Sequence, residues 1–253
     1  MAERKKPLIH DPLRTGPKDP TVVEAVKKAT PARVAIGRAG PCFSTKALIK
    51  LWEDTAVAKD AIWSELSDDF PEKIGVPAIM TKSTAKDKMD YILFPDKGKK
   101  FDDESLKLVK EKCKEYPEIQ FVVCDGLSAY GIEKYVPQIL PKLVEKLKEK
   151  GFDIPNPTII VRYGRLGITE CIGELLHPTL CVTFVADRPG FAFAESISAF
   201  LTYKPTKDTR DANRDAYCNI WEKGTKPEEA VDVLAKMIEE AIRVKKYTGV
   251  KVE

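Results

Sequence analysis

The stretch that decides the fold covers residues 157–190 and reads PTIIVRYGRLGITECIGELLHPTLCVTFVADRPG. Two apolar runs, 158–161 and 180–185, flank a segment with helical spacing, and each run ends in a turn rich in charge and glycine. Such apolar runs are typical of strands buried on both faces of a parallel sheet. The stretch therefore predicts a parallel strand-helix-strand unit. Its two turns lie where ligands bind in open parallel sheets, beyond the carboxyl ends of the strands.

Further strands and helices extend this unit in both directions. Upstream, residues 119–124 form a compact apolar run that ends in the turn 125–128, the same strand-then-turn pattern. Pro141 predicts that the next helix starts late or is kinked; its inner face is formed by Ile139, Leu140, Leu143 and Leu147. Downstream, residues 198–203 alternate like a strand, and residues 225–249 predict a last helix with one apolar stripe.

The amino-terminal part of the chain predicts helices. Residues 1–20, rich in proline, glycine and charge, are expected to form an arm, followed by a short helix and then a long one that begins after Ser44. Residues 67–100 are mixed, with a short strand expected over 91–93. We therefore predict an α/β chain: a helical N-terminal arm and domain over residues 1–98, then a Rossmann-like domain over 99–253, with a mainly parallel sheet flanked by helices.

The composition indicates a soluble globular protein. Of the 253 residues 43% are hydrophobic, and the formal net charge is +3 with no long run of one sign. The sequence shows neither the stripe of cations that nucleic acid requires nor the run of about 20 apolar residues that spans a bilayer. Two histidines and six cysteines without a C-x-x-C pair offer little for a metal site or a Cys-His nucleophile. We expect no nucleic acid, membrane or metal partner, and reduced cysteines in the core.

Charged and polar side chains gather at the predicted strand ends and in the long polar segment 207–217: Asp125, Ser128, Arg162, Arg165, Asp187, Arg188, Arg210 and Arg214. They could pair with one another as structural salt bridges, or they could bind a ligand. An arginine cannot act as a general base, and no histidine lies near them in the sequence. The set suits binding of a large polar ligand or a protein partner, and we predict no catalytic residue. The G-x-G-x-x-G fingerprint and the Walker phosphate loop are both missing.

Six motifs, in order and spacing, resemble those of the small (light) subunit of ethanolamine ammonia-lyase: residues 33–40 (RVAIGRAG), 125–128 (DGLS), 161–165 (VRYGR), 172–176 (IGELL), 187–190 (DRPG) and 203–205 (YKP). The resemblance implies a lyase that depends on adenosylcobalamin and converts ethanolamine to acetaldehyde and ammonia. It also implies a large subunit, a TIM barrel that binds the substrate, while the small subunit closes over the cobalamin in a multimer of large-small pairs. We expect this chain to be inactive alone.

The resemblance also carries over three cobalamin contacts. They are Leu166, where relatives can have another aliphatic residue; Asp187, where a glutamate is common; and Ala216, where some relatives have a cysteine. Cys218, two residues further on, leaves the register of the third contact open. Since Leu166 and Asp187 follow two strands that we expect to be neighbours, their turns should lie side by side at one rim of the sheet.

Two absences refine this interpretation. Neither His10 nor His177 lies in an Asp-x-His-x-x-Gly motif, so the cofactor should keep its own dimethylbenzimidazole on cobalt. The family's amino-terminal extension, which can direct relatives into a bacterial microcompartment, is short here. We therefore expect a cytoplasmic chain, with a microcompartment as the alternative. Two other functions stay open: an independent Rossmann-like enzyme that acts on a phosphate or nucleotide ligand, and a structural adaptor without a ligand.

Overall fold

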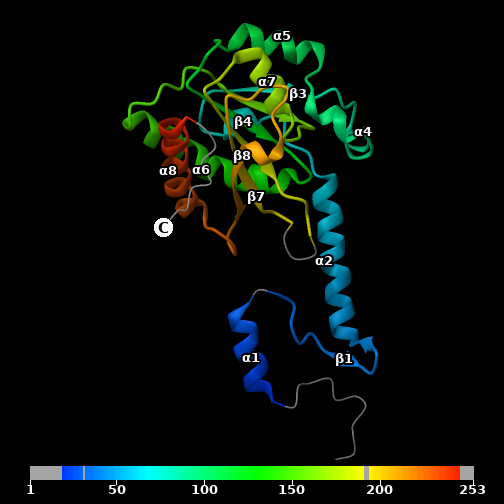
Figure 1. Ribbon diagram of the computed structural model, residues 1–253. Helices are drawn as coiled ribbons and strands as arrows, with labels where there is room; N and C mark the ends of the chain where they lie inside the picture. The colour runs from blue at the N-terminus through cyan, green and yellow to red at the C-terminus, as the bar shows by residue number, and fades with distance from the viewer. Residues whose placement is uncertain (1–18, 31, 191–193, 246–253) are drawn as a thin grey trace, which may run out of the picture. The chain divides into compact units, whose positions relative to one another are not determined.

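The computed structural model describes residues 19–30, 32–190 and 194–245 (Figure 1). The chain divides into two compact units, Met1–Val57 and Ala58–Glu253. The described part of the first unit contains helix α1 (Pro20–Ala29), the small hairpin of β1 (Arg38–Ala39) and β2 (Cys42–Phe43), and the start of α2 (Thr45–Trp63). A purely helical N-terminal domain is therefore not confirmed. Most of the predicted arm, and the predicted end of the last helix at Gly249, lie outside the described residues.

The second unit is built on one six-stranded sheet. In spatial order its strands are β3 (Ala78–Lys82), β5 (Thr158–Arg162), β4 (Ile119–Cys124), β6 (Leu180–Ala186), β7 (Ile197–Tyr203) and β8 (Arg214–Ile220). The pairs from β3 to β6 are parallel, whereas β6-β7 and β7-β8 are antiparallel. The prediction of a mainly parallel sheet was therefore wrong: the sheet is mixed, because the chain turns back after β6 and again after β7 without the helical crossover that parallel strands need.

The strand order also bears on the fold family. The dinucleotide-binding fold has the order 3-2-1-4-5-6, whereas this sheet begins with β3, β5 and β4. A Rossmann-like fold is therefore not confirmed. Strand β4 pairs with both β5 and β6, so the expectation that β5 and β6 are neighbours was wrong. All three strands run in the same direction, however, and their carboxyl ends meet at one edge of the sheet.

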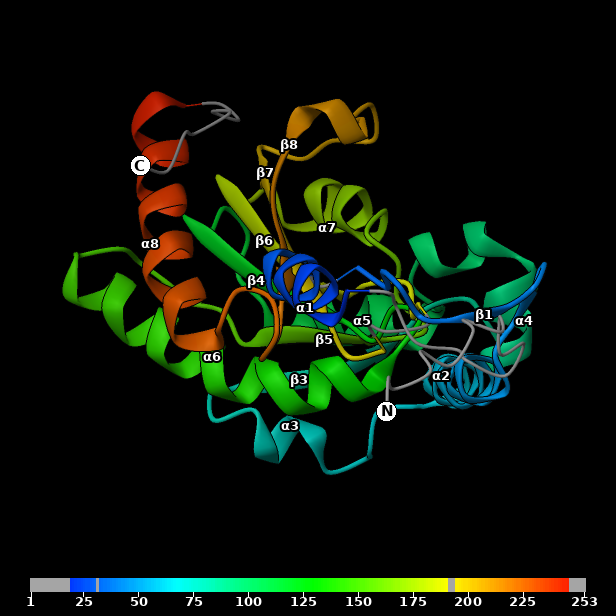
Figure 2. The ribbon, with the colours of Figure 1, turned by 90° about the horizontal axis from the view of Figure 1, so that it is seen from below.

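Helices cover both faces of the sheet (Figures 1 and 2). On one face the core joins α3 (Phe70–Lys73), α6 (Ala129–Glu149) and α8 (Pro227–Val244) to strand residues such as Phe121 and Val123. On the other face α5 (Asp103–Lys112) and α7 (Ile168–Leu176) pack on Val122 and Cys124, which follow Phe121 and Val123 along β4. This alternation follows from the two-residue period of a strand. Each buried aliphatic or aromatic side chain contributes about 1.5–3 kcal/mol.

The predicted helices α6 and α8 are confirmed, although their starts differ. Helix α6 begins at Ala129 and continues through Pro137 and Pro141, so it does not start late. Its four predicted inward-facing residues are all fully buried: Ile139, Leu140, Leu143 and Leu147. Helix α8 begins after Lys226, and its apolar stripe is buried from Val231 to Ala241.

Three elements differ from the prediction. Residues 91–93 belong to a helix, α4 (Lys88–Leu93), because the Asp87 side chain caps it by accepting a hydrogen bond from the Asp90 N–H at 2.8 Å. Strand β3 was not predicted; it precedes the expected boundary at residue 98, which stays a prediction. The segment 207–217 is not entirely loop, since the short helix η2 (Asp211–Asn213) and the edge strand β8 occupy its second half. The remaining short helix, η1 (Pro95–Lys99), follows α4.

Candidate functional site

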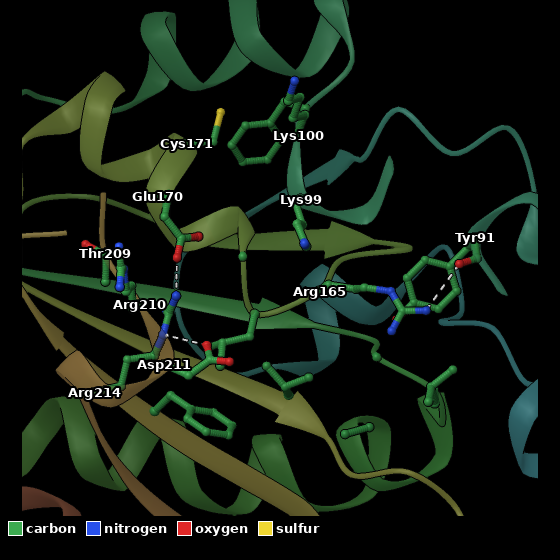
Figure 3. A pocket seen from close by; sticks show the side chains of 18 of the residues that line it. Tyr91, Lys99, Lys100, Arg165, Glu170, Cys171, Thr209, Arg210, Asp211 and Arg214 are labelled. Atoms are coloured by element: carbon green, nitrogen blue, oxygen red, sulfur yellow. Dashed lines mark hydrogen bonds and ion pairs between the residues drawn. The ribbon is translucent and has the colours of Figure 1, made fainter. Parts of the chain in front are cut away.

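A pocket of about 1100 Å³ lies at the carboxyl ends of β4, β5 and β6 (Figure 3). The turns after these strands supply part of its wall, and α7 and the segment before β8 supply another part. A third part comes from α4, η1 and the residues after it. Residues from these parts include Tyr91, Lys99, Lys100, Leu127, Arg165, Leu166, Glu170, Glu174, Asp187, Arg188, Phe200, Arg210 and Arg214. Apolar and charged side chains thus share one cavity.

Asp125, directly after β4, fixes the turn that carries Leu166. Its side chain is fully buried and accepts hydrogen bonds from the backbone N–H groups of Tyr163 at 2.9 Å and Gly164 at 3.0 Å. Tyr163 has a φ of 56°, in the left-handed region that costs most residues energy. The two hydrogen bonds offset this cost, and they hold the turn after β5 against the end of β4.

A buried lysine lies near Asp125. Lys88, at the start of α4, is only 3% exposed, and its Nζ donates to the carbonyl oxygen of Gly126 at 3.3 Å. Burial raises the pKa of Asp125 to about 6, although the positive charge of Lys88 and the two backbone donors lower it. Burial likewise lowers the pKa of Lys88, while Asp125 opposes that shift. Two ionisable side chains kept out of water therefore lie next to Gly126, which lines the pocket.

Arg165 and Tyr91 form one side of the pocket. The guanidinium of Arg165 lies 4.5 Å from the centre of the Tyr91 ring, and its Nη2 donates to the Tyr91 carbonyl oxygen at 3.3 Å. The Tyr91 hydroxyl donates to the carbonyl oxygen of Gly164 at 3.2 Å. A cation over an aromatic face contributes about 0.5–2 kcal/mol, depending on how well water is excluded. These contacts connect α4 to the turn that carries Leu166.

Glu170 and Arg214 form an ion pair on the opposite wall, with Asp211 beside it (Figure 3). Glu170 lies in the first turn of α7 and Arg214 is the first residue of β8. The Arg214 side chain is 3% exposed; its Nη2 contacts Glu170 Oε1, and its Nε lies 3.5 Å from Asp211 Oδ1. Burial raises the pKa of Glu170, and Arg214 opposes the shift. Arg214 Nη1 and Glu170 Oε2 are buried and have no hydrogen-bond partner among the described residues.

The three residues carried over from the family lie close to this pocket. Leu166 and Asp187 both line it, and Asp187 accepts a hydrogen bond from the Ser198 hydroxyl at 2.5 Å. Ala216 does not line it; it is exposed on β8, directly opposite Phe200, which does. Cys218 is exposed on the same strand. The register of the third contact therefore stays open.

The other polar residues predicted at the strand ends divide into two groups. Ser128 and Arg162 have structural partners: the Ser128 hydroxyl donates to the carbonyl oxygen of Ala194 at 2.8 Å, and Arg162 donates to Leu66 and to Asp68. Four line the pocket: Arg165, Arg188, Arg210 and Arg214. Sequence reasoning missed Lys88 and Tyr91, which it placed in a mixed segment. It also missed Glu170 and Glu174, whose spacing of four along a helix next to a strand end was the available signal.

Two glycines bring separate motifs into contact. Gly126 has a φ of +56°, and a Cβ there would lie 2.7 Å from the Ala186 carbonyl oxygen, so the turn after β4 touches the end of β6. A Cβ on Gly173 would lie 2.1 Å from the carbonyl oxygen of Pro205, so α7 packs on the backbone after β7. The motif at 172–176 thus touches the motif at 203–205, and the motif at 125–128 touches Ala186, the residue before the motif at 187–190.

No group of histidine, cysteine and carboxylate side chains among the described residues could hold a metal ion. Cys171 lines the pocket, and burial raises the pKa of its thiol, as it does for the buried Cys113, Cys124 and Cys181. Within the described ranges, no helix is both long enough and apolar enough to cross a bilayer.

Comparison with known proteins establishes the family. A model of the ethanolamine ammonia-lyase light chain matches residues 20–253. The chain belongs to this family. It is 36% identical over 219 residues to the ethanolamine ammonia-lyase small subunit of Fusobacterium nucleatum subsp. nucleatum, covering 87% of this chain and 73% of that protein. The resemblance inferred from the six motifs is thus confirmed.

Two further relatives carry the same description. The small subunit of Clostridium perfringens is 35% identical over 246 residues, covering 97% of this chain and 81% of the relative. The small subunit of Clostridium acetobutylicum is 34% identical over 221 residues, covering 87% of this chain and 90% of the relative. The similarity therefore extends over most of both chains.

Proposed function

We propose that this chain is the small subunit of an adenosylcobalamin-dependent ethanolamine ammonia-lyase, which converts ethanolamine to acetaldehyde and ammonia. In this proposal the chain binds a large subunit that holds the substrate, and covers the cobalamin at their interface; several large-small pairs form the multimer. Membership of the light-chain family and the names of the relatives support it. We expect the chain alone to be inactive, since in this proposal the large subunit holds the substrate and no side chain of the pocket is a source of the radical.

One observation carries the cobalamin part of the proposal. Leu166 and Asp187 follow different strands that are not neighbours, yet both line the same pocket. The residues fit a corrinoid, which has a broad apolar ring and a periphery of amide groups. Leu127, Leu166 and Phe200 offer apolar contact, while buried polar atoms without partners on Glu170 and Arg214 offer hydrogen bonds. Ala216 or Cys218, on the adjoining strand, supplies the third contact.

The chain's own residues position and shield the cofactor. Asp125 holds the turn that presents Leu166, and Ser198 orients the Asp187 carboxylate. The bound cofactor supplies a cobalt-carbon bond as the source of the radical, which no side chain of the pocket could provide. Water exclusion by the apolar wall would protect that reactive chemistry.

The partner and the location are part of the same proposal. Helix α2 exposes Ile49, Trp52 and Val57, apolar side chains that a partner subunit would cover. An obligate interface with the large subunit would bury of order 2,000 Å² or more. We place the enzyme in the cytoplasm, with encapsulation as the alternative, and assign residues 99–253 to the cobalamin-covering domain.

A phosphate or nucleotide ligand is the second candidate. Lys99, Lys100 and Arg210 at the pocket favour an anion, since such side chains bind phosphate. Glu170, Glu174 and Asp211 line the same cavity and disfavour it. Stabilisation of the isolated chain by a nucleotide, with no corrinoid in the complex, would select this function instead.

The test is co-expression with the cognate large subunit, followed by Leu166→Arg. We expect a red, cobalamin-containing complex from the wild-type chain. In the variant a large cation faces the bound cofactor, which should weaken cobalamin binding by roughly 1–3 kcal/mol, the usual cost of an unpaired buried polar group. Folding should change much less, because Leu166 lines a pocket and is not a core residue.

Leu93→Arg is the matched control, because Leu93 is 61% exposed on α4 and does not line the pocket. It should leave cobalamin affinity unchanged. Equal affinity of the wild type and Leu166→Arg would show that the cobalamin site is misplaced. Turnover of ethanolamine by the purified single chain would refute the subunit role.

A further inference from the structure

The wall between α7 and β8 contains an ion pair that is only half satisfied. Arg214 and Glu170 bind each other through one guanidinium nitrogen and one carboxylate oxygen. The second atoms of each group, Arg214 Nη1 and Glu170 Oε2, are buried and lack a hydrogen-bond partner in the described part of the chain. Both side chains line the pocket. A buried polar atom left unpaired costs about 1–3 kcal/mol, so two such atoms on paired side chains that line a pocket indicate a missing ligand group.

The charges of the pair narrow the class of that group. Glu170 and Asp211 would repel an anion, although Arg214 alone would attract one. Arg214 would likewise repel a cation. The group that fits is neutral, with an N–H donor for the carboxylate oxygen and an acceptor for the guanidinium. A hydroxyl offers both functions on a single oxygen, whereas a primary carboxamide offers them on two atoms, as the two unpaired protein atoms require.

We propose that Glu170 and Arg214 form a subsite for a primary carboxamide of the ligand. The amide NH₂ donates to Glu170 Oε2, and the amide oxygen accepts from Arg214 Nη1. The identity of the ligand rests on the proposed function: the periphery of a corrin ring carries primary carboxamides, and one of them occupies this subsite. Glu170 and Arg214 thereby fix the rotation of the ring in the pocket.

The experiment uses the complete complex with the large subunit. The probes are cyanocobalamin and a panel of its monocarboxylic acids, in each of which one peripheral carboxamide is hydrolysed to a carboxylate. Dissociation constants are measured by equilibrium dialysis with absorbance detection, so no turnover is needed. The wild-type complex should bind one acid of the panel about ten-fold more weakly than cyanocobalamin, because that carboxylate meets Glu170 Oε2.

Glu170→Gln should remove this discrimination, since the glutamine amide can donate to the carboxylate of that same acid. It should also weaken the binding of cyanocobalamin, because the glutamine oxygen stays paired with Arg214 Nη2 and the glutamine NH₂ then faces the NH₂ of the ligand. Glu174→Gln is the matched control: it removes the same charge from the same pocket one turn along α7, where Glu174 Oε1 accepts from the Lys207 N–H at 3.1 Å. The control should keep the ten-fold discrimination.

The outcomes separate this inference from the proposed function. A wild-type complex that binds cyanocobalamin and every acid equally well overturns the subsite and leaves the cobalamin site standing. Discrimination that persists in Glu170→Gln overturns the subsite in the same way. A wild-type complex that binds no cyanocobalamin overturns both. If Glu170→Gln fails to assemble, the double variant Glu170→Leu with Arg214→Met, which removes the carboxylate together with its partner, should abolish the discrimination; its persistence there would overturn the subsite.

Discussion

Two carboxylates next to the same pocket behave differently. Asp125 is fully buried, and both of its oxygens accept backbone hydrogen bonds, one from Tyr163 and one from Gly164. Glu170 has one oxygen on Arg214 and the other, although buried, without a partner among the described residues. Both sit opposite a buried cation, Lys88 for Asp125 and Arg214 for Glu170.

The difference separates scaffold from binding surface. A carboxylate whose oxygens are all used holds protein to protein, and its removal leaves several groups unpaired at once. A carboxylate with an unpaired oxygen at a pocket wall gains its remaining hydrogen bond only when a ligand binds. Asp125 should therefore determine stability, and Glu170 should determine which ligand is accepted.

The largest expected effect is that of Asp125→Ala on folding. The variant leaves the N–H groups of Tyr163 and Gly164 without acceptors and Lys88 buried without its counter-charge. Removal of one partner from a buried charged pair costs about 3–5 kcal/mol, so the free energy of unfolding from urea titration should fall by that amount.

Asp68→Ala is the control for Asp125→Ala, because Asp68 pairs with Arg162 but its side chain is 95% exposed. It should cost less than about 1 kcal/mol. Adding Lys88→Met to Asp125→Ala should restore only part of the loss, since the two backbone donors stay unpaired. Equal losses for Asp125→Ala and Asp68→Ala would contradict the scaffold role.

The pH dependence of stability sharpens the same point and should be the next largest effect. The pKa of Asp125 is raised from 3.8 to about 6 in the fold, so the folded chain holds this proton more tightly than the unfolded chain does. The stability that Asp125 contributes is therefore fully present below about pH 4 and is lost as the pH rises through about 6. Measured against Asp125→Asn to remove other titrations, the loss should be on the order of 2–3 kcal/mol. If the stability of the wild type relative to Asp125→Asn instead rises with pH, then Lys88 and the backbone donors stabilise the carboxylate by more than burial destabilises it.

The central strands could be predicted from the sequence because strands buried on both faces consist mostly of apolar residues. Strands β4, β5 and β6 are continuous apolar runs, and α8 shows its stripe clearly. The edge strands β3 and β8 are only partly buried, and their sequences lack the continuous apolar run that predicts a strand. Their place depends on the edge they pair with, which a single sequence does not state.

The candidate site divides in the same way. Leu166 and Asp187 could be placed at one pocket because the carboxyl ends of parallel strands share an edge, even though β4 separates their strands. The burial of Lys88 and the partial burial of Glu170 could not be predicted, because charged residues are usually exposed and their burial depends on packing between distant segments. Topology, more than composition, brings them to the pocket.

Gly173→Ala tests whether α7 is positioned closely enough to present Glu170. A Cβ at Gly173 would lie 2.1 Å from the Pro205 carbonyl oxygen, so α7 or the segment after β7 must shift. Such overpacking costs about 1–3 kcal/mol, and the shift should also reduce the discrimination between cyanocobalamin and the sensitive monocarboxylic acid. Gly190→Ala is the control, since its Cβ would meet nothing within 4 Å; it should change stability by less than about 0.5 kcal/mol. Unchanged stability of Gly173→Ala would indicate that the contact yields easily.

The smallest effect on stability is expected from replacing the whole Glu170–Arg214 pair by apolar residues, as Glu170→Leu with Arg214→Met. Exchange of a buried ion pair for apolar side chains of similar volume is often neutral, because the desolvation cost of both charges disappears together with their attraction. The free energy of unfolding of the full chain should therefore stay within about 1 kcal/mol of the wild type, while the complex loses its discrimination among the corrinoid probes.

The corresponding exchange at the other carboxylate, Asp125→Leu with Lys88→Met, should stay strongly destabilised, since no apolar residue can accept the hydrogen bonds of Tyr163 and Gly164. Urea titration of the two double variants side by side tests the comparison directly. If both lose the same stability, then Glu170 and Arg214 belong to the scaffold as Asp125 does. If only the Asp125 double variant loses stability and only the Glu170 double variant loses discrimination, then Asp125 stabilises the fold around the pocket and Glu170 selects the ligand.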